Sequence, residues 1–170
     1  KDSFCDFATA LRHVSKYDGL GVGVFDGLCA IDLDHCVQPD KTLTALAADV
    51  VETMDSYTEY SPSGTGLRIL FSADGFAYDK ARYYINNQKL GLEIYVSGAT
   101  HKFVTVTGNA LRERGLEDRS QQLLTVLGKY MRRPVAKAAP KPDAGKSYLS
   151  DASVLEKAAK SSQADKFNRL

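Results

Sequence analysis

Strand-like segments occur in this sequence in pairs, with helix-like segments between and beside them. Helical apolar spacing or helix-forming composition predicts helices over residues 3–16, 42–54, 119–130 and 151–160. β-like runs predict strands over residues 20–25, 28–33, 67–71, 92–96 and 103–107. Because strands and helices do not alternate regularly as βαβ units, the order predicts an α+β fold, a mostly antiparallel sheet with flanking helices.

Turn residues separate these runs and in one case predict a hairpin. Asp26-Gly27 separates the runs 20–25 and 28–33, and this dipeptide is a strong hairpin signal. Ser97-Gly98 is expected to turn the chain between the runs 92–96 and 103–107. The first helix is expected to be capped by Ser3 and to pack an apolar stripe against the protein. That stripe consists of Phe4, Phe7, Leu11 and Val14.

The bulk composition is that of a soluble protein with one compact domain and a tail. The chain has 170 residues, of which 44% are hydrophobic and 25% charged. It contains no run of about 20 apolar residues and no charged-then-apolar leader, so a cytoplasmic location is expected. Prolines among alanines and lysines predict a linker over residues 133–148. The expected division is a catalytic domain at 1–132, the linker, and the start of a helical segment at 149–170.

Charge and cysteine content exclude several functions. The net charge of +1 does not indicate a strongly basic nucleic-acid-binding domain. The stretch 129–146 holds six basic residues and one acid, so it either follows a phosphate backbone or is a solvated linker. Cys5, Cys29 and Cys36 form no CxxC pair and no zinc spacing. We expect reduced thiols, with Cys29 buried beside a strand.

The sequence IDLD at residues 31–34 is expected to place two carboxylates on one face of a strand. Side chains alternate along a strand, so Ile31 and Leu33 face one way and Asp32 and Asp34 the other. Two acids on one face repel each other unless cations lie between them, and Mg²⁺ and Mn²⁺ take carboxylate ligands. A metal site and a solvent-exposed face both explain this pattern.

A third acid occurs in the same pattern on a later strand. Leu92 and Ile94 flank Glu93, so its carboxylate is expected on the polar face, although a solvated Glu is the alternative for this residue alone. Three acids suffice to hold two divalent ions at a spacing of roughly 3.5 to 4 Å. Replacing any of the three by Ala is expected to relieve repulsion and to leave the fold intact.

Residues 59–68 (EYSPSGTGLR) are expected to bind phosphate. Gly64 and Gly66 allow backbone N–H groups to approach an anion, and Ser63, Thr65 and Arg68 add side-chain donors. The GK[ST] ending of a Walker A loop is absent, which disfavours a P-loop ATPase. A plain hairpin loop would also use Ser, Pro and Gly.

Further polar residues stand beside the last predicted strand. His101 and Lys102 begin a run whose polar face carries Thr105 and Thr107. His101, Lys102 and Thr107 are expected to contact the triphosphate of a nucleotide. His35 is expected to support the acids from just beyond them.

In combination, four stretches resemble the primase-polymerase domain of the archaeo-eukaryotic primase superfamily, in the branch found in phage and plasmid replication proteins. They are residues 17–21 (YDGLG), 31–36 (IDLDHC), 57–67 (YTEYSPSGTGL), and 93–95 (EIY) with 103–108 (FVTVTG). The resemblance runs from about residue 3 to residue 108. It implies an RRM-like catalytic core in which Asp32 and Asp34 form the first metal-binding motif, the Ser-Gly loop binds the nucleotide and Glu93 is the third acid.

The chain departs from the superfamily pattern at one position. The second motif of the superfamily commonly ends in a histidine that touches the incoming nucleotide, and Arg68 stands there in this chain. Arginine binds phosphate through several donors but cannot donate a proton near neutral pH. Arg68 is therefore expected to keep the electrostatic role of the histidine in binding phosphate, but not a role in proton transfer.

The resemblance implies template-directed nucleotidyl transfer, as a DNA primase, a DNA polymerase or both. The expected partners are a DNA template and nucleoside triphosphates, and the expected cofactors are two Mg²⁺ or Mn²⁺ ions. The chain begins with Lys1 and stops within helix-like sequence, so we expect it to be a piece of a longer protein, with a helicase domain beyond it. The alternatives are a metal-dependent nuclease or phosphohydrolase and a non-catalytic replication-initiation module that binds nucleic acid.

Overall fold

The computed structural model describes residues 4–134 and 150–161. The chain divides into two compact units, residues 1–134 and residues 135–170. In the second unit, helix α4 (Asp151–Ala159) begins after Ser150, whose hydroxyl accepts a hydrogen bond from Ser153 N, so the helix predicted there is confirmed. Residues 135–148 of the predicted linker lie outside the described residues. No helix in the described part of the chain is long and apolar enough to cross a bilayer.

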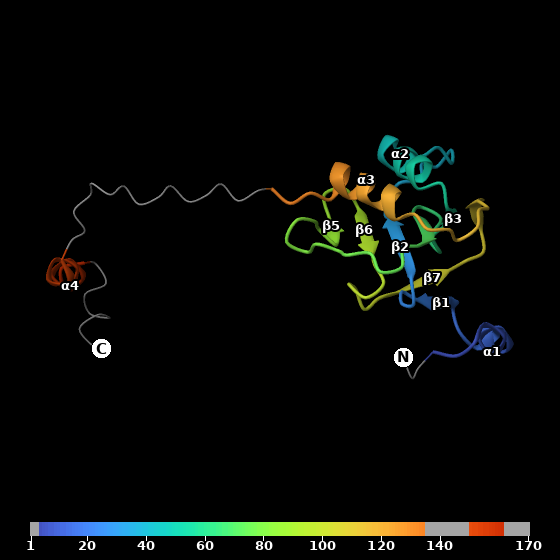
Figure 1. The fold of residues 1–170 in the computed structure, drawn as a ribbon, viewed down its shortest axis with the longest axis horizontal. Helices are drawn as coiled ribbons and strands as arrows, with labels where there is room; N and C mark the ends of the chain where they lie inside the picture. The colour runs from blue at the N-terminus through green and yellow to red at the C-terminus, as the bar shows by residue number, and fades with distance from the viewer. Residues whose placement is uncertain (1–3, 135–149, 162–170) are drawn as a thin grey trace. The chain divides into compact units, whose positions relative to one another are not determined.

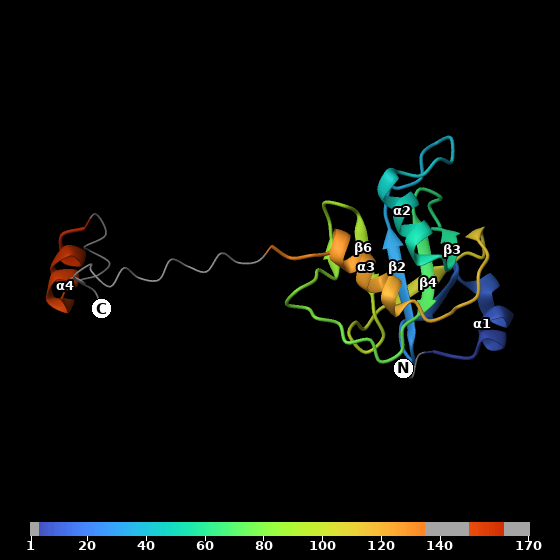
Figure 2. The same ribbon diagram turned by 45° about the horizontal axis from the view of Figure 1, so that its top comes forward.

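The first unit is built on a six-stranded sheet in which neighbouring strands are antiparallel (Figure 1 and Figure 2). The strand order is β5-β6-β2-β4-β3-β8. The strands are β2 (Leu28–Leu33), β3 (Tyr57–Tyr60), β4 (Leu67–Ser72), β5 (Asn86–Asn87), β6 (Leu92–Tyr95) and β8 (Ala110–Arg112). Together with the helices, this antiparallel sheet confirms the predicted α+β fold class.

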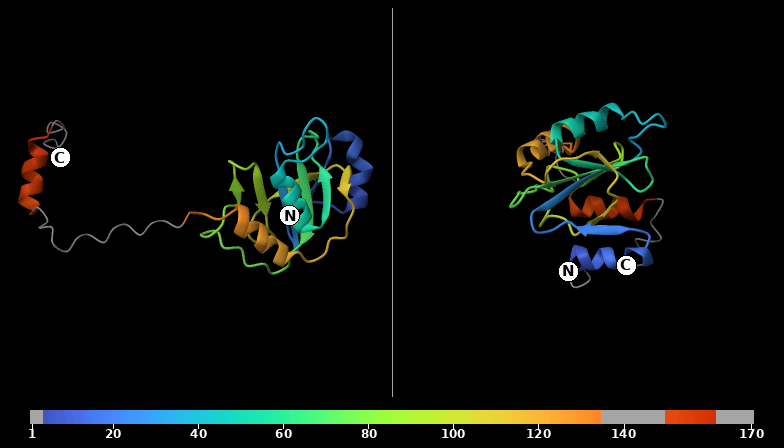
Figure 3. Two further views of the ribbon diagram at one scale, coloured as in Figure 1. Left: turned by 90° about the horizontal axis from the view of Figure 1, so that it is seen from above. Right: turned by 90° about the vertical axis from the view of Figure 1, so that its right-hand side faces the viewer.

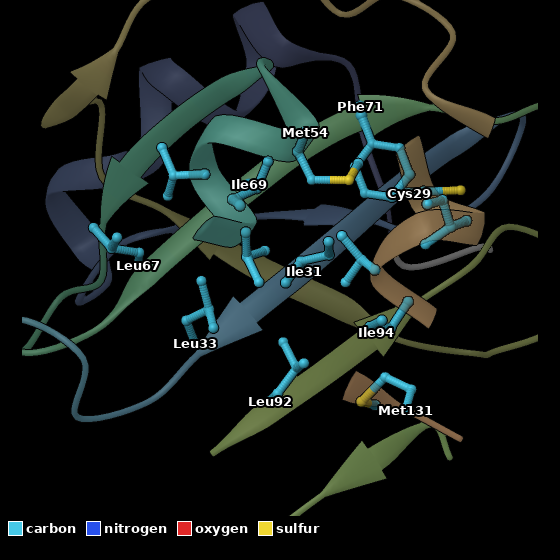
Figure 4. Close-up of a cluster of buried hydrophobic side chains, with 14 of the residues drawn as sticks. Cys29, Ile31, Leu33, Met54, Leu67, Ile69, Phe71, Leu92, Ile94 and Met131 are labelled. Carbon is cyan, nitrogen blue, oxygen red and sulfur yellow. The ribbon is translucent and has the colours of Figure 1, made fainter. Parts of the chain in front are cut away.

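Two helices cover one face of this sheet (Figure 3). Helix α2 (Ala45–Met54) is capped by the Thr44 hydroxyl and ends at Asp55, which adopts the left-handed conformation. Helix α3 (Ser120–Tyr130) packs beside it. Because alternate strand residues point to this face, their apolar side chains meet those of the helices in one core. Figure 4 shows part of it, including Cys29, Ile31, Leu33, Met54, Leu67, Ile69, Phe71, Leu92, Ile94 and Met131.

A second, two-stranded sheet lies on the opposite face (Figure 3). It consists of β1 (Leu20–Gly23) and β7 (Phe103–Val106), paired antiparallel. A smaller cluster of buried side chains joins the two sheets, formed by Val24, Ala30, Leu70, Tyr95 and Val104. The six-stranded sheet is therefore enclosed by helices on one face and partly by β1 and β7 on the other.

The predicted hairpin of residues 20–25 and 28–33 is wrong, although the strands themselves form. Asp26 and Gly27 adopt left-handed φ values of 52° and 83° and turn the chain, but β1 pairs with β7, while β2 pairs with β4 and β6. Both edges of β2 are thus occupied by other strands. Ser97-Gly98 turns the chain between β6 and β7, as predicted, and these two strands belong to different sheets. The turn residues specified a change of direction and not a pairing partner.

Three strands were not predicted. The most important is β3, because it takes in Glu59 and Tyr60 from the stretch expected to bind phosphate, and the loop begins only after Tyr60. Thr58 and Glu59 in β3 are fully buried. Strands β5 and β8 are two and three residues long, too short for a pattern of alternation to mark them.

The first helix differs from its prediction in its cap and its packing. Helix α1 (Phe7–His13) begins after Asp6, whose carboxylate accepts a backbone N–H three residues on, and Ser3 lies outside the described residues. A short 3₁₀ helix (Val14–Lys16) follows it. Phe7 is 69% exposed and α1 contains no buried residue. The expected packing of the apolar stripe is therefore only partial: the Phe4 ring packs edge-on against Phe25, with 5.4 Å between centroids, while Phe7 and Leu11 are exposed.

Candidate functional site

A row of polar side chains crosses the six-stranded sheet on the face that carries β7. In register, Glu59 lies opposite Arg68, Arg68 opposite Asp32, Asp32 opposite Glu93, and Glu93 opposite Asn86. Residues directly opposite each other in antiparallel strands project to the same face. These five residues, from five adjacent strands, are called the polar row below. The row brings Asp32, Glu93 and Arg68, which are far apart in sequence, onto one surface.

Arg68 stands at the centre of the row and ties it to β7. Its Nε lies 3.5 Å from Oδ1 of Asp32, and both side chains are largely buried, at 15% and 17% exposure. One terminal nitrogen of Arg68 donates to the Thr105 carbonyl at 3.0 Å and to the Thr105 hydroxyl. The buried Nε makes no hydrogen bond in the described protein. The guanidinium is thus held between Thr105 and Asp32, with its Nε buried beside the Asp32 carboxylate.

Burial raises the pKa of the Asp32 carboxyl, and the nearby Asp34 and Glu93 carboxylates raise that pKa further. Arg68 lowers the pKa of Asp32, but the raising influences outweigh it. The burial of Asp32 is the largest of these influences on its pKa, ahead of the charge of Arg68. Added positive charge would stabilise the ionised form of Asp32.

Glu93 and Asp34 occupy different environments beside Asp32. The two carboxylate oxygens of Glu93 accept hydrogen bonds at 2.6 Å, one from the Asn86 amide and one from the Tyr95 hydroxyl. Burial and the bond to Glu93 raise the pKa of Tyr95, so this hydroxyl keeps its proton and donates it. Asp34 is exposed immediately after β2, and its N–H donates to the Gly91 carbonyl at 2.8 Å.

The expected metal ligands have suitable chemistry, but they do not form a closed cluster. Among residues 4–134 and 150–161, no group of three or more His, Cys, Asp or Glu side chains is placed to hold a metal ion. Asp32 and Glu93 nevertheless lie directly opposite each other, and carboxylate oxygens are the ligands that Mg²⁺ and Mn²⁺ prefer. Their oxygens face Arg68, Asn86 and Tyr95. The metal site stays a prediction that requires Asp34 and Glu93 to reorient.

The Ser-Gly loop, residues 61–66, joins β3 to β4 at the end of the sheet where Asp34 lies. Ser61 N donates to Gly66 O, and Gly66 N donates to the Ser61 hydroxyl at 3.1 Å. A Cβ added to Gly66 would lie 2.6 Å from the carbonyl oxygen of Leu33, so only glycine allows the loop to pack against the end of β2. The loop therefore lies beside the end of β2, which Asp34 follows directly.

Hydroxyl groups line the outer side of this loop. The Ser63 hydroxyl hydrogen-bonds the Ser61 hydroxyl at 3.0 Å and the Thr65 hydroxyl at 2.9 Å. Ser63 and Thr65 are exposed, and Gly64 adopts a left-handed φ of 71°. The donors expected to bind phosphate are thus accessible, and at present they bond to one another.

Strand β7 crosses over the polar row. Lys102 lies just before β7, with its Nζ 5.7 Å from the ring centroid of Tyr95 in β6. Thr105 contacts Arg68 in β4, and the Thr107 hydroxyl donates to the Tyr60 carbonyl in β3 at 2.9 Å. Lys102 therefore stands near Glu93, whereas the Thr107 hydroxyl is engaged within the protein.

The two histidines of the prediction are both exposed. His101 lies before β7, next to Lys102, and His35 follows Asp34 with a left-handed φ of 51°. His35 thus turns the chain directly after the acids. The structure gives neither imidazole a contact with the polar row.

Glu59 is the residue of the site that sequence reasoning missed. It is fully buried, and its carboxylate accepts hydrogen bonds from the backbone N–H groups of Thr107 and Gly108, both at 2.9 Å. The Tyr57 hydroxyl also donates to it at 2.9 Å. Glu59 therefore holds the end of β7 against the sheet. The alternating pattern of YTEY was the available signal for a strand in which this side chain faces the protein.

Comparison with known proteins finds a similar phage protein but no matching family model. No protein-family model matches the sequence. One curated protein is similar over most of the chain. It is the DNA Primase-polymerase of Nitratiruptor phage NrS-1, which is 28% identical over 157 residues, covering 89% of this chain and 21% of the phage protein. The chain thus spans about a fifth of the length of this relative. The similarity supports a distant relationship to primase-polymerases.

Proposed function

We propose that this chain carries out template-directed nucleotidyl transfer, as a DNA primase, a DNA polymerase or both, in phage or plasmid replication. The observation that carries the proposal is the placement of Asp32 directly opposite Glu93, with Arg68 on its other side and Asp34 immediately beyond. The similarity to a phage DNA primase-polymerase supports the same activity. In this proposal the partners are a DNA template and nucleoside triphosphates.

Asp32, Asp34 and Glu93 would hold two Mg²⁺ or Mn²⁺ ions. When bound, such ions activate an attacking 3′-hydroxyl and neutralise the leaving pyrophosphate. The protein supplies the carboxylates on rigid strands, because Asp32 and Glu93 are fixed in register by the sheet. Tyr95 and Asn86 orient the Glu93 carboxylate through its two hydrogen bonds. Like-charge repulsion among the acids favours cation binding.

Arg68 would bind a phosphate of the incoming nucleotide. Its guanidinium is held by Thr105 and faces Asp32, and guanidinium groups match phosphate oxygens through several donors. The exposed Ser63 and Thr65 hydroxyls, at the same end of the sheet, would add donors to the triphosphate once released from each other. Lys102, next to the Tyr95 ring, would add positive charge.

A direct test incubates the full chain with a primed DNA template, labelled deoxyribonucleotides and Mn²⁺. Extension of the primer that depends on the template sequence is the expected result. Shortening of the primer would instead indicate a nuclease, and an unchanged primer with DNA bound would indicate a non-catalytic module. The Asp32→Asn/Glu93→Gln variant is the matched control, because it removes two charges from the polar row with little change in side-chain size.

A further inference from the structure

Five exposed cations lie on two neighbouring segments of the first unit, residues 80–89 before β6 and residues 132–133 just after α3. They are Lys80, Arg82, Lys89, Arg132 and Arg133. Residues 78–89 and 130–134 contain a single acid, Asp79. These five cations are called the basic surface below.

Backbone hydrogen bonds hold the two segments of the basic surface together. Tyr84 N donates to Met131 O at 2.7 Å, and Arg133 N donates to Arg82 O at 2.9 Å. The side-chain Nε of Arg133 donates to the carbonyls of Lys80 and Tyr83. The cations are therefore presented together by ordered backbone.

The charge of the basic surface is not neutralised within the described protein. Among residues 4–134 and 150–161, none of its five cations forms an ion pair with a carboxylate. Cations elsewhere in the first unit do, including Lys129 with Asp49 at 2.7 Å and Arg119 with Glu117 at 2.8 Å. Unpaired cations grouped on one surface favour a polyanion, because binding releases the counterions of its phosphates.

A polar pocket has Lys89 of the basic surface and Asn86 of the polar row among its lining residues. It has a volume of about 460 Å³ and is lined by Tyr84, Asn86, Asn87, Gln88 and Lys89. The Asn86 amide hydrogen-bonds Glu93, so the pocket borders the candidate active site. Asn and Gln amides hydrogen-bond the edges of bases. The pocket thus offers amide groups for a base next to cations for its backbone.

We propose that the basic surface binds the phosphate backbone of single-stranded DNA and that the pocket beside Asn86 takes one of its bases. This inference rests on the proposed function for the identity of the strand, which is the template. The strand then passes from the end of α3 to Glu93. Single-stranded nucleic acid suits this surface because unpaired bases are free to enter a pocket.

The test measures binding of a fluorescent single-stranded oligonucleotide to the full chain over a range of salt concentrations, without metal ions or nucleotides. The Lys89→Ala/Arg132→Ala variant removes two cations whose side chains make no hydrogen bond or ion pair within the described residues. Each lost phosphate contact reduces the magnitude of the slope of log K against log salt by about 0.7 for single strands. We expect a reduction of about 1.4 and weaker binding at every salt concentration tested.

The Arg12→Ala/Lys16→Ala variant is the matched control, because it removes the same charge from the exposed residues of α1 and the 3₁₀ helix. We expect its binding to equal that of the parent. An unchanged slope in the Lys89/Arg132 variant, an equal loss in the control, or a parent that does not bind would overturn the proposal. If the Lys89/Arg132 variant unfolds at a lower temperature, Lys80→Ala/Lys89→Ala replaces it.

The outcome separates this proposal from the proposed function. If the chain binds DNA through the basic surface but incorporates no nucleotide, the DNA-binding proposal stands and the polymerase activity is refuted. If the chain extends primers but these substitutions leave the salt slope unchanged, the polymerase activity stands and DNA binding by the basic surface is refuted.

Discussion

The Nε of Arg68 lies 3.5 Å from a carboxylate oxygen of Asp32, which is directly opposite it on the neighbouring strand. The residue where the sequence departs from the superfamily pattern is thus paired with the first acid of the expected metal motif. Arg68 also bonds to Thr105, so one guanidinium connects β2, β4 and β7. The pairing gives Arg68 a structural role in addition to its proposed contact with phosphate.

We predict that Arg68→Ala weakens nucleotide binding by about 1.5 to 3 kcal/mol, the typical contribution of a hydrogen bond to a charged group. Arg68→Lys should recover part of the affinity, since a point charge does not reproduce a bidentate grip on phosphate. Arg68→His should keep more activity than Arg68→Ala if the position corresponds to the histidine of the superfamily. Titration of a labelled nucleotide and primer extension measure the two effects.

A matched control for Arg68 is Arg112→Ala, on β8 of the same sheet. Arg112 pairs with Glu52 and Asp55 at 2.8 and 2.9 Å, away from the polar row, so its loss should leave nucleotide binding unchanged. Binding and incorporation at parental level by the Ala, Lys and His variants of Arg68 would show that the phosphate site lies elsewhere.

A second prediction concerns the three acids, which we expect to be required for incorporation. Asp32→Ala, Asp34→Ala and Glu93→Ala should each abolish primer extension while the proteins remain folded. Their effects on stability should differ, because Asp32 is the ion partner of Arg68 and Glu93 accepts two hydrogen bonds. Only Asp34→Ala is expected to stabilise the metal-free protein, because Asp34 is exposed and its loss removes a like charge from the acids.

Thermal unfolding without metal ions checks this order of stabilities. Asp34→Ala should unfold at or above the temperature of the parent, and Asp32→Ala below it, because the buried Arg68 loses its carboxylate partner. Near-normal primer extension by an Asp32→Ala/Asp34→Ala variant would end the two-metal hypothesis. Equal unfolding temperatures for both single variants would show that the Asp32–Arg68 pair adds nothing to stability.

Much of the secondary structure could be predicted from local sequence, and strand pairing could not. Helices α2, α3 and α4 follow from their apolar spacing or composition, because each helix presents one face that the nearby sequence encodes. Asp26-Gly27 correctly marks a turn, but the partner of β1 is β7, some 80 residues further on. Pairing depends on which surfaces are buried together, and that information is spread over the whole chain.

The site shows the same division between local and distant information. Alternation placed Asp32 and Glu93 on the same face, and the register confirms it. The burial of Glu59 could not be predicted, because the N–H groups that offset the desolvation of its carboxylate belong to Thr107 and Gly108. Likewise, the pairing of Arg68 with Thr105 depends on β7 crossing the sheet.

We predict that Glu59→Gln lowers the free energy of unfolding by about 2 to 3 kcal/mol. The carboxylate accepts two backbone N–H groups and a tyrosine hydroxyl, and a neutral amide presents one acceptor oxygen and an N–H₂ group that faces donors. Urea denaturation measures the effect. Glu117→Gln is the control, because this exposed acid pairs with Arg119 at the surface and should cost less than about 1 kcal/mol. Equal losses in both variants would refute a special role for Glu59.

The last prediction concerns Gly66, where the Ser-Gly loop meets the end of β2. An Ala Cβ at this position would lie 2.6 Å from the Leu33 carbonyl oxygen and 3.1 Å from the Ser61 hydroxyl. Since the first contact is with backbone, the loop or the end of β2 must move, and Asp34 follows Leu33 directly. We therefore expect Gly66→Ala to lower both the unfolding temperature and the rate of primer extension.

Gly128 in α3 offers a control in which Ala is expected to stabilise the protein, because nothing lies within 4 Å of a Cβ built there. Gly128→Ala should raise the free energy of unfolding by about 0.5 to 1 kcal/mol through improved helix propensity, with primer extension unchanged. If Gly66→Ala instead matches the parent in both measurements, the loop has room to shift without moving the acids. The contact between Gly66 and Leu33 would then not be what holds the Ser-Gly loop beside Asp34.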